Sequence, residues 1–246
     1  MSEYEPSTYG DRMADIYDQW FGIPADTAAC VAFLADHATA GPALELGIGT
    51  GRIAIPLAQR GVDIHGIDAS ETMVARLRAK PGGTQIPVAI GNFADVSIEG
   101  SFSLIFVVFN TFFALLSQDD QLRCFANVAR RLTRDGVFVI EAFVPDLARF
   151  SRGQRVEARR IEPNHVYLDA ARHDPVEQRV FAQHVALSED GVRLYPVQIR
   201  YAWPSELDLM ARLVGLRLRE RWGGWQQEAF AAASTRHVSI YERASS

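Results

Sequence analysis

Three glycines at alternating positions, Gly47, Gly49 and Gly51, mark the part of the chain best suited to ligand binding. They follow the apolar run 43–48, which is typical of a strand, and precede a helical pattern over 51–60. Glycine lets the backbone turn tightly and approach a ligand, and the free N–H groups at the start of a helix face that ligand. The stretch therefore predicts a small-molecule site where a strand turns into a helix.

An acidic residue, Asp68, ends the next predicted strand, 62–68, where a carboxylate can accept both hydroxyls of a ribose. A dinucleotide site requires G-x-G-x-x-G, but this chain has Arg52 where the last glycine would stand. Glu45, just before the turn, is a poor neighbour for a pyrophosphate, but it can help to hold the ammonium group of S-adenosylmethionine. Both residues favour S-adenosylmethionine over a nicotinamide dinucleotide.

Strand and helix patterns alternate from residue 43 to 143, which is typical of a parallel sheet with right-handed crossovers. We expect strands over 43–48, 62–68, 87–91, 102–109 and 137–143, and helices over 51–60, 70–79 and 119–132. Ligands of such sheets bind in the crevice beyond the carboxyl ends of the strands. The predicted fold class is α/β, with helices on both faces of the sheet.

The pattern changes beyond residue 150. Residues 155–203 alternate polar and apolar, with turn signals at 163–164, 174–175 and 190–191, which predicts three or four antiparallel strands in a small inserted sheet. A helix over 204–213 and strands over 216–222 and 237–242 follow, and helical patterns over 11–21 and 26–37 precede the first strand. We therefore expect an N-terminal helical lid (1–40), a core (41–150), the inserted sheet (151–203) and a C-terminal part of the core (204–246).

The overall composition restricts the classes of partner. The chain has 25 Lys and Arg against 30 Asp and Glu, a net charge of −5, which argues against sequence-independent binding of nucleic acid. The longest apolar stretch, 102–116, is shorter than the roughly 20 residues of a membrane span, and residues 1–6 are acidic and polar, unlike a secretory leader. Cys30 and Cys124 lie far apart in the sequence, which favours two free thiols in a reducing compartment over a disulfide. We expect a cytoplasmic protein without membrane or nucleic-acid partners.

Four motifs together resemble those of class I S-adenosylmethionine-dependent methyltransferases. Residues 45–52 match the first motif of that family, 66–70 the second and 91–95 the adenine motif, while 133–139 resembles its approach to the fifth strand. The resemblance implies a Rossmann-like, mostly parallel sheet of seven strands, closed by a hairpin within 196–243. The inserted sheet and the aromatic segment 9–20 are similar to actinobacterial small-molecule N-methyltransferases of antibiotic pathways.

The resemblance also implies the contacts of the cofactor, S-adenosylmethionine. Asn92 stands where the family usually has an aspartate, and its amide oxygen can still accept the adenine amino group, although without charge. Arg52 either pairs with the cofactor carboxylate or faces solvent. The implied contacts lie along the ribose, the adenine and the methionyl part, and they are Tyr17, Glu45, Gly47, Gly49, Arg52, Asp68, Ala69, Met73, Asn92, Phe93, Phe109 and Asn110.

Methyl transfer is an in-line displacement in which the protein mainly orients the nucleophile and excludes water. A neutral amine needs no strong base, whereas a hydroxyl usually needs a base or a metal. No His–Asp or His–Glu spacing indicates a dyad, and no cluster has the spacing of a metal site, so we predict no metal. The candidate catalytic residues are Tyr9, Tyr17 and Glu141, although packing for the tyrosines and bonding to backbone for Glu141 are structural alternatives.

The predicted function is methyl transfer to a small molecule, with an amine nitrogen favoured as acceptor. The alternatives are an O-methyltransferase of a small hydroxylated metabolite, a nicotinamide-dependent oxidoreductase and a noncatalytic nucleotide-binding protein. The intact glycine turn and Asp68 argue against simple loss of activity. The inserted sheet also offers a surface for a homo-oligomer.

Overall fold

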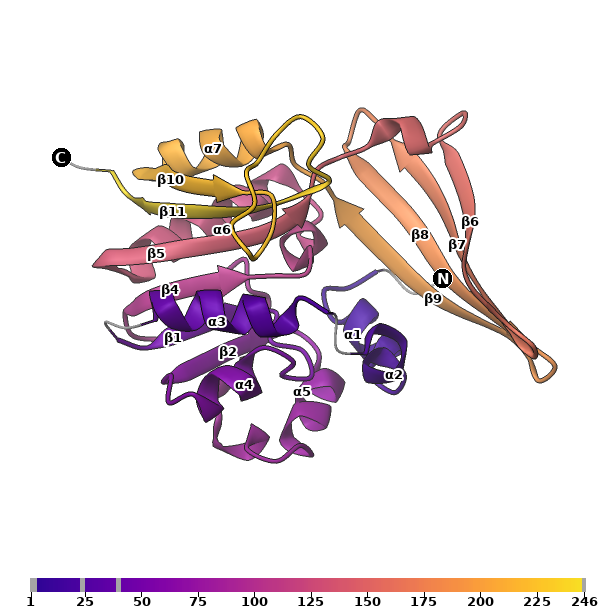
Figure 1. Ribbon diagram of the computed structural model, residues 1–246, viewed down its shortest axis with the longest axis horizontal. Coiled ribbons are helices and arrows are strands. Elements are labelled where there is room, and N and C mark those ends of the chain that lie inside the picture. The colour runs from indigo at the N-terminus through magenta and orange to yellow at the C-terminus, as the bar shows by residue number, and fades with distance from the viewer. Residues whose placement is uncertain (1–3, 23–24, 39–40, 245–246) are drawn as a thin grey trace.

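A computed structural model describes residues 4–22, 25–38 and 41–244 of the chain. Its larger sheet contains β1 (Ala43–Leu46), β2 (Ile64–Asp68), β3 (Val88–Ile90), β4 (Phe102–Val107), β5 (Leu132–Phe143), β10 (Leu216–Trp222) and β11 (Arg236–Arg243). Their order in space is β10-β11-β5-β4-β1-β2-β3 (Figure 1). Strands β1 to β5 pair in parallel, and β11 runs antiparallel to both of its neighbours, β5 and β10. This confirms the predicted mostly parallel sheet of seven strands.

Helices cover both faces of this sheet, which is why its central strand β4 is buried along its whole length. One apolar core lies under α6 (Gln118–Arg131) and α7 (Pro204–Leu213) and includes Phe125 and Phe138. The other core lies under α3 (Thr27–His37), α4 (Ala54–Gln59) and α5 (Glu71–Arg78) and includes Leu34 and Phe106. Single 3₁₀ turns complete the core: η1 (Gly83–Gln85), η2 (Thr111–Ala114) and η3 (Leu147–Arg149).

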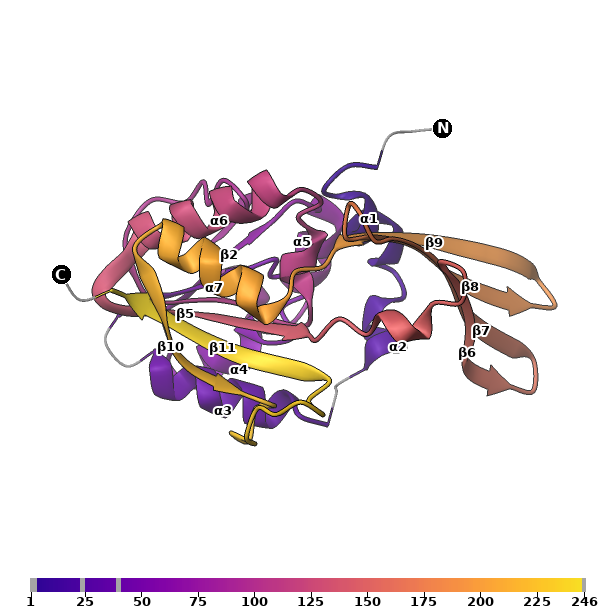
Figure 2. The same cartoon turned by 90° about the horizontal axis from the view of Figure 1, so that it is seen from above.

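The smaller sheet is an antiparallel meander of four strands, β6 (Gln154–Glu162), β7 (His165–Asp174), β8 (Arg179–Ser188) and β9 (Gly191–Arg200). The turns between the strands fall at the three predicted signals. Figure 2 shows this sheet extending away from the core, with helices α1 (Thr8–Met13) and α2 (Tyr17–Phe21) between the two. Its inner face, which carries Tyr167, Asp169, His184 and Tyr195, is directed towards Trp20 of α2.

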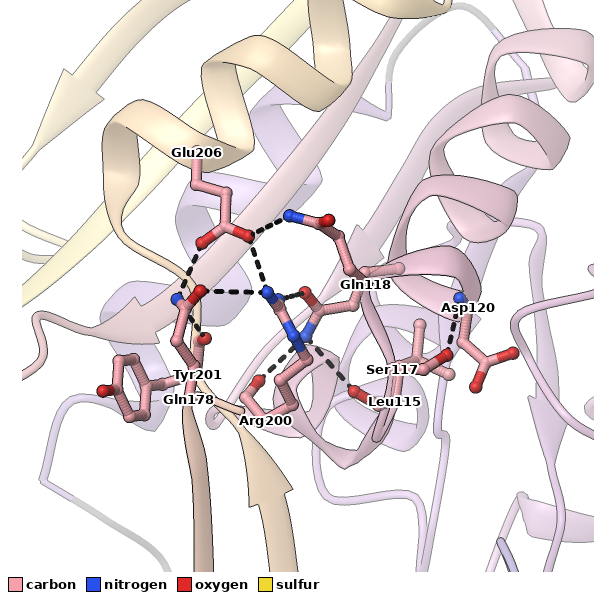
Figure 3. Close-up of polar contacts among 9 residues, drawn as sticks. Leu115, Ser117, Gln118, Asp120, Gln178, Arg200, Tyr201 and Glu206 are labelled. Atoms are coloured by element: carbon pink, nitrogen blue, oxygen red, sulfur yellow. Dashed lines mark hydrogen bonds and ion pairs between the residues drawn. The ribbon is translucent and has the colours of Figure 1, made fainter. Parts of the chain in front are cut away.

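A buried polar network joins the inserted sheet to the core (Figure 3). Arg200, at the end of β9, donates to the Gln121 side chain of α6 at 2.6 Å and to Glu206 of α7 at 2.8 Å. Gln178 and Gln118 donate to the same Glu206 carboxylate at 2.9 and 2.8 Å. Because every partner is satisfied, these contacts can fix the position of the sheet instead of leaving a costly unpaired charge.

Two local predictions are corrected. The helix expected over 11–21 is two short helices, α1 and α2, separated by a turn at residues 14–16. Strand β5 begins at Leu132, which pairs with Phe102, and its register then shifts before Val137 pairs with Leu104. The predicted turn at Asp135 is therefore an irregular stretch inside the strand. None of the helices in the described residues combines the length and apolar character needed to cross a membrane.

Candidate functional site

The glycine turn lies at the carboxyl end of β1, beside the end of β2. Gly47, Gly49 and Gly51 have φ angles of +74°, +54° and +80°, which side chains other than glycine rarely adopt. A Cβ atom at Gly47 would lie 2.5 Å from Cγ2 of Thr111, so the turn has no room for a side chain there. The Gly47 N–H donates to the Ile67 carbonyl at 2.8 Å. The turn therefore presents bare backbone at the edge where two parallel strands end.

Asp68 links this turn to the loop after β2. One of its carboxylate oxygens accepts the Gly49 N–H at 2.8 Å, and the other accepts the Ser70 N–H at 2.9 Å. Burial raises the pKa of Asp68, while these two N–H groups oppose the change. Each carboxylate oxygen can accept more than one hydrogen bond, so both remain able to receive a ligand hydroxyl.

Glu45 is a buried carboxylate whose Oε2 atom has no hydrogen-bond partner among the described residues. Burial raises its pKa to about 8, with the Asp68 charge adding to this effect and the Arg52 charge opposing it. An unpaired buried carboxylate oxygen is costly unless a donor or a cation satisfies it. The ammonium group of S-adenosylmethionine is such a cation, so Glu45 and Asp68 fit opposite ends of that cofactor.

The segment after β4 forms a strained turn at the same edge. Phe109 and Asn110 have φ angles of +58° and +65°, a conformation that persists only when the surroundings fix it. The Glu141 carboxylate accepts the Phe109 N–H at 2.6 Å, and the Asn110 side chain accepts the Phe143 N–H at 2.7 Å. Glu141 is thus a strand carboxylate bonded to backbone, which matches the structural role expected for it as the alternative to a catalytic one. Burial raises its pKa, and the bond from Phe109 opposes that change.

Arg52 does not simply face solvent. Its guanidinium lies 4.6 Å from the centre of the Phe109 ring and donates to the Thr27 hydroxyl at 3.3 Å. Tyr17 lies close enough to Arg52 that the positive charge lowers the tyrosine pKa, although burial is the larger effect and raises it. Arg52, Tyr17 and Phe109 therefore form one group beside Glu45.

The residues expected around adenine divide between two places. The Phe93 ring is buried and lies 3.9 Å from where a Cβ atom of Gly47 would be. The Asn92 amide oxygen accepts the Ala94 N–H at 2.9 Å, so one acceptor position of that side chain is occupied within the loop. Met73 instead packs against Gly10 of helix α1, 3.1 Å from the position of a Cβ atom there.

Helices α1 and α2 are tied to the glycine turn by polar contacts that the sequence did not indicate. Asp18 accepts from the Thr50 hydroxyl at 2.7 Å and pairs with Lys80 at 2.7 Å. The Ser70 hydroxyl donates to Asp11 at 2.6 Å. These partners are far apart in the chain, so no local pattern could have revealed them.

An aromatic cluster, defined here as Tyr9, Tyr17, Trp20, Phe21 and Phe109, extends from this edge to the inserted sheet. Its neighbouring ring centres are 6.5 Å apart for Tyr9 and Tyr17, 4.9 Å for Tyr17 and Phe21, and 5.5 Å for Phe21 and Phe109. Burial raises the pKa of Tyr9 well above its usual value, and the neighbouring Tyr17 adds to this. Both tyrosines therefore keep their hydroxyl protons near neutral pH.

The structure contains a histidine–carboxylate pair that no spacing in the sequence indicated. His184 Nδ1 lies 2.5 Å from a carboxylate oxygen of Asp169 on the inner face of the inserted sheet. The two residues are direct partners across strands β7 and β8. Asp174 pairs with Arg179 across a four-residue turn, and the turn signal at Asp174-Pro175 does not give that length, so the sequence did not reveal this register.

Comparisons with known proteins agree with this geometry. Residues 43–136 match a family model described as a methyltransferase domain. The structure of the CcbJ methyltransferase from Streptomyces caelestis is 42% identical, covers 98% of this chain and 100% of that chain, and superposes with a TM-score of 0.93. The chain belongs to the S-adenosylmethionine-dependent methyltransferases.

More distant similarities agree with the fold of this methyltransferase. The cypemycin N-terminal methyltransferase of a Streptomyces species is 23% identical over 97% of this chain and 99% of its own length. The sugar N-methyltransferase KedS8 from a Streptoalloteichus species is 18% identical, with a TM-score of 0.68 and 99% of both chains covered. The methyltransferase therefore uses S-adenosylmethionine, as Glu45 and Arg52 indicated, in place of the nicotinamide cofactor considered as an alternative.

Proposed function

We propose that the methyltransferase transfers a methyl group from S-adenosylmethionine to an amine nitrogen of a small molecule. The observation that carries this proposal is the aromatic cluster beside Glu45 and the glycine turn. Ring faces attract cations, and a nitrogen acceptor is cationic both before it loses a proton and after it is methylated. A hydroxyl acceptor, the alternative, gains little from such surroundings.

The cofactor contacts follow from the same geometry. Bound S-adenosylmethionine supplies a methyl group that is already activated as a sulfonium. Glu45 holds the ammonium group, Asp68 and Ala69 hold the ribose, and Gly47 and Gly49 let both approach the backbone. Arg52 and Tyr17 face the methionyl carboxylate, and the turn at Phe109 and Asn110 borders the methionyl chain. Asn92 and Phe93 border the adenine from the loop after β3, and Met73, which also packs on Gly10, borders it from α5.

The tyrosines of the aromatic cluster orient the acceptor instead of removing its proton. Because burial raises the pKa values of Tyr9 and Tyr17, their hydroxyls are donors near neutral pH. Glu141 positions the Phe109 turn through its bond to the backbone. Catalysis then rests mainly on holding the amine in line with the methyl group and excluding water.

The activities of two structural relatives support nitrogen as the acceptor atom and an antibiotic pathway as the setting. KedS8 is a sugar N-methyltransferase, and a further structural neighbour, CalS10, is an amino pentose methyltransferase involved in calicheamicin biosynthesis. We place the enzyme in the cytoplasm, a setting supported by the two buried free thiols, Cys30 and Cys124.

The test is a panel of small amines, each paired with the alcohol or phenol of the same shape. S-adenosylhomocysteine formation and a product heavier by one methyl group are measured by mass spectrometry. We expect turnover of amines and little turnover of the matched hydroxyl compounds. Preferential methylation of the hydroxyl compounds would replace the proposal with the O-methyltransferase alternative.

We also propose that a second copy of the chain covers the outer face of the inserted sheet, which carries Val156, Leu168, Phe181 and Leu194. Side chains alternate across a strand, and these four lie on the face opposite that of Tyr167, Asp169 and His184. Val156 is 69% exposed and Leu194 56%, and exposed apolar side chains gathered on one face often mark a protein interface.

Sedimentation of the parent and of two charge variants tests the oligomer. Leu194→Glu should dissociate it, whereas Val176→Glu, at an exposed position in the turn between β7 and β8, should leave it intact. A parent that sediments as a monomer at all concentrations would contradict the proposal.

A further inference from the structure

The inner face of the inserted sheet holds an oriented imidazole. Asp169 is buried, with one oxygen bonded to His184 Nδ1 and the other to the Arg159 guanidinium. Burial alone would raise the pKa of Asp169, but His184 and Arg159 outweigh it and the pKa is lowered. Asp169 therefore stays a carboxylate, so Nδ1 of His184 carries the proton and donates it. The other ring nitrogen, Nε2, is left with a free lone pair.

This imidazole faces the aromatic cluster. Its ring centre is 5.9 Å from Trp20 and 6.4 Å from Phe21, and Phe21 in turn contacts Phe109. A single aromatic ring thus separates His184 from the turn at the carboxyl end of β4. The His184 side chain is 16% exposed, and no described residue hydrogen bonds to Nε2. The imidazole is therefore not fully enclosed, and its lone pair has no partner within the part of the chain that the structure describes.

The other histidines of the inserted sheet differ from His184 in their surroundings. His173 bonds to the Tyr201 hydroxyl through Nε2 at 2.9 Å and stacks on Phe150, so it is engaged in packing. His165 is exposed at the far end of the β6–β7 hairpin and stacks on Tyr167. Within the described residues, His184 is the sheet histidine that combines a buried carboxylate partner with a second nitrogen that has no hydrogen-bond partner.

We propose that His184, oriented by Asp169, accepts the proton that the acceptor nitrogen must lose before methyl transfer. This inference rests on the proposed N-methyltransferase function. Nε2 of His184 takes a proton from the acceptor ammonium group, which frees the nitrogen lone pair, and the imidazolium then passes that proton to water. The lone pair forms the bond to the methyl carbon, the carbon–sulfur bond breaks, and its electron pair stays on sulfur.

A weak base suits this step. Imidazoles change charge between about pH 5 and 8 and so can accept protons near neutral pH, and the methyl transfer that follows consumes the neutral amine and draws the deprotonation forward. The charged and titratable groups that face the imidazole are Asp169 on its neighbouring strand, Arg155, Glu157 and Arg159 of β6, Tyr195 of β9 and Tyr9 of α1.

Steady-state kinetics on an accepted amine provide the first test, with His184→Gln, Asp169→Asn and the control His165→Gln. The parent kcat should fall at acid pH, as general-base catalysis requires. His184→Gln should lower kcat at least about tenfold and abolish that acid limb, with the affinity for S-adenosylmethionine within about twofold of the parent. Asp169→Asn should lower kcat less, and His165→Gln should not change it. Full kcat with an unchanged pH profile in His184→Gln would overturn the proposal.

Nitrogen-15 NMR of labelled histidines provides a second test that needs no acceptor. In the complex with S-adenosylhomocysteine, His184 should carry its proton on Nδ1 and should redistribute it between the two nitrogens in Asp169→Asn. A proton on Nε2 in the parent would overturn the inference, whichever compounds the enzyme methylates. If the parent methylates no amine but carries the His184 proton on Nδ1, the proposed N-methyltransferase function is wrong, while the orientation of His184 by Asp169 still holds.

Discussion

The Arg200 guanidinium at the end of β9 lies 2.8 Å from the Glu206 carboxylate in the first turn of α7; Arg200 is buried and Glu206 is half-buried. This pair stands where the inserted sheet returns to the core, and Gln178 hydrogen bonds to both of its members (Figure 3). The joint therefore sets the position of His184 and Tyr195 relative to the glycine turn.

Breaking this joint should destabilise the protein strongly. Arg200→Met leaves the half-buried Glu206 without its cation. Losing one partner of a fully buried pair costs about 3–5 kcal/mol, and because Gln118 and Gln178 still donate to Glu206 we expect about 2–3 kcal/mol here. Denaturant unfolding of the variant should show a loss of this size. Arg149→Met is a matched control, because Arg149 forms an exposed ion pair with Glu157 at 3.0 Å and should change stability little. Equal losses of stability in the two variants would show that the Arg200–Glu206 pair stabilises the protein no more than an exposed ion pair does.

Asp68→Ala should weaken the binding of S-adenosylmethionine. The substitution removes the ribose acceptor and the bond that holds Gly49, so the expected loss is about ten- to hundredfold, or roughly 1.5–3 kcal/mol. Titration calorimetry measures it, with Asp119→Ala on the exposed side of α6 as the control. Unchanged affinity in Asp68→Ala would remove Asp68 from the cofactor site.

Glu45 should make cofactor binding depend on pH. Its pKa of about 8 in the free protein means that the side chain is protonated at neutral pH. Contact with the cofactor ammonium favours the carboxylate, so binding must release that proton. Affinity should therefore rise with pH, approaching about tenfold per unit between about pH 6 and 7, where the cofactor amine itself stays charged.

The same titration in buffers of different ionisation enthalpy counts the released proton. We expect nearly one proton for the parent and none for Glu45→Gln. If the affinity of the parent for S-adenosylmethionine does not change with pH, Glu45 does not contact the ammonium group of the cofactor.

Tyr9→Phe and Tyr17→Phe should lower turnover without altering the fold. Each keeps the ring in the aromatic cluster and removes one hydroxyl donor, so kcat should fall at least about tenfold while Tm stays nearly constant. Tyr4→Phe is the control, because the Tyr4 hydroxyl accepts the Gln198 N–H of β9 at 3.2 Å and should affect Tm instead. If both variants keep the kcat of the parent, the two hydroxyls play no part in turnover and the aromatic cluster serves only for packing.

Local patterns were sufficient for the features that depend on neighbouring residues. The glycines of 47–51, the Ser70 cap of α5 and the hairpin turns of the inserted sheet each follow from backbone geometry within a few residues. Contacts between distant segments were not accessible in this way. Asp18 reaches Thr50 and His184 reaches Asp169 only after the tertiary fold brings their elements together.

Helices α1 and α2 are bonded to the loops after β1 and β2 through Asp18 and Asp11, and the same helices place Trp20 against the inner face of the inserted sheet. One segment thus covers the cofactor side and also forms part of the acceptor side. We expect exchange of the cofactor to require movement of that segment, which would take apart the acceptor side at the same time. The expected order of each turnover is that the methyl donor enters before the amine, the methylated amine leaves first, and S-adenosylhomocysteine leaves last, an order that product-inhibition kinetics measure.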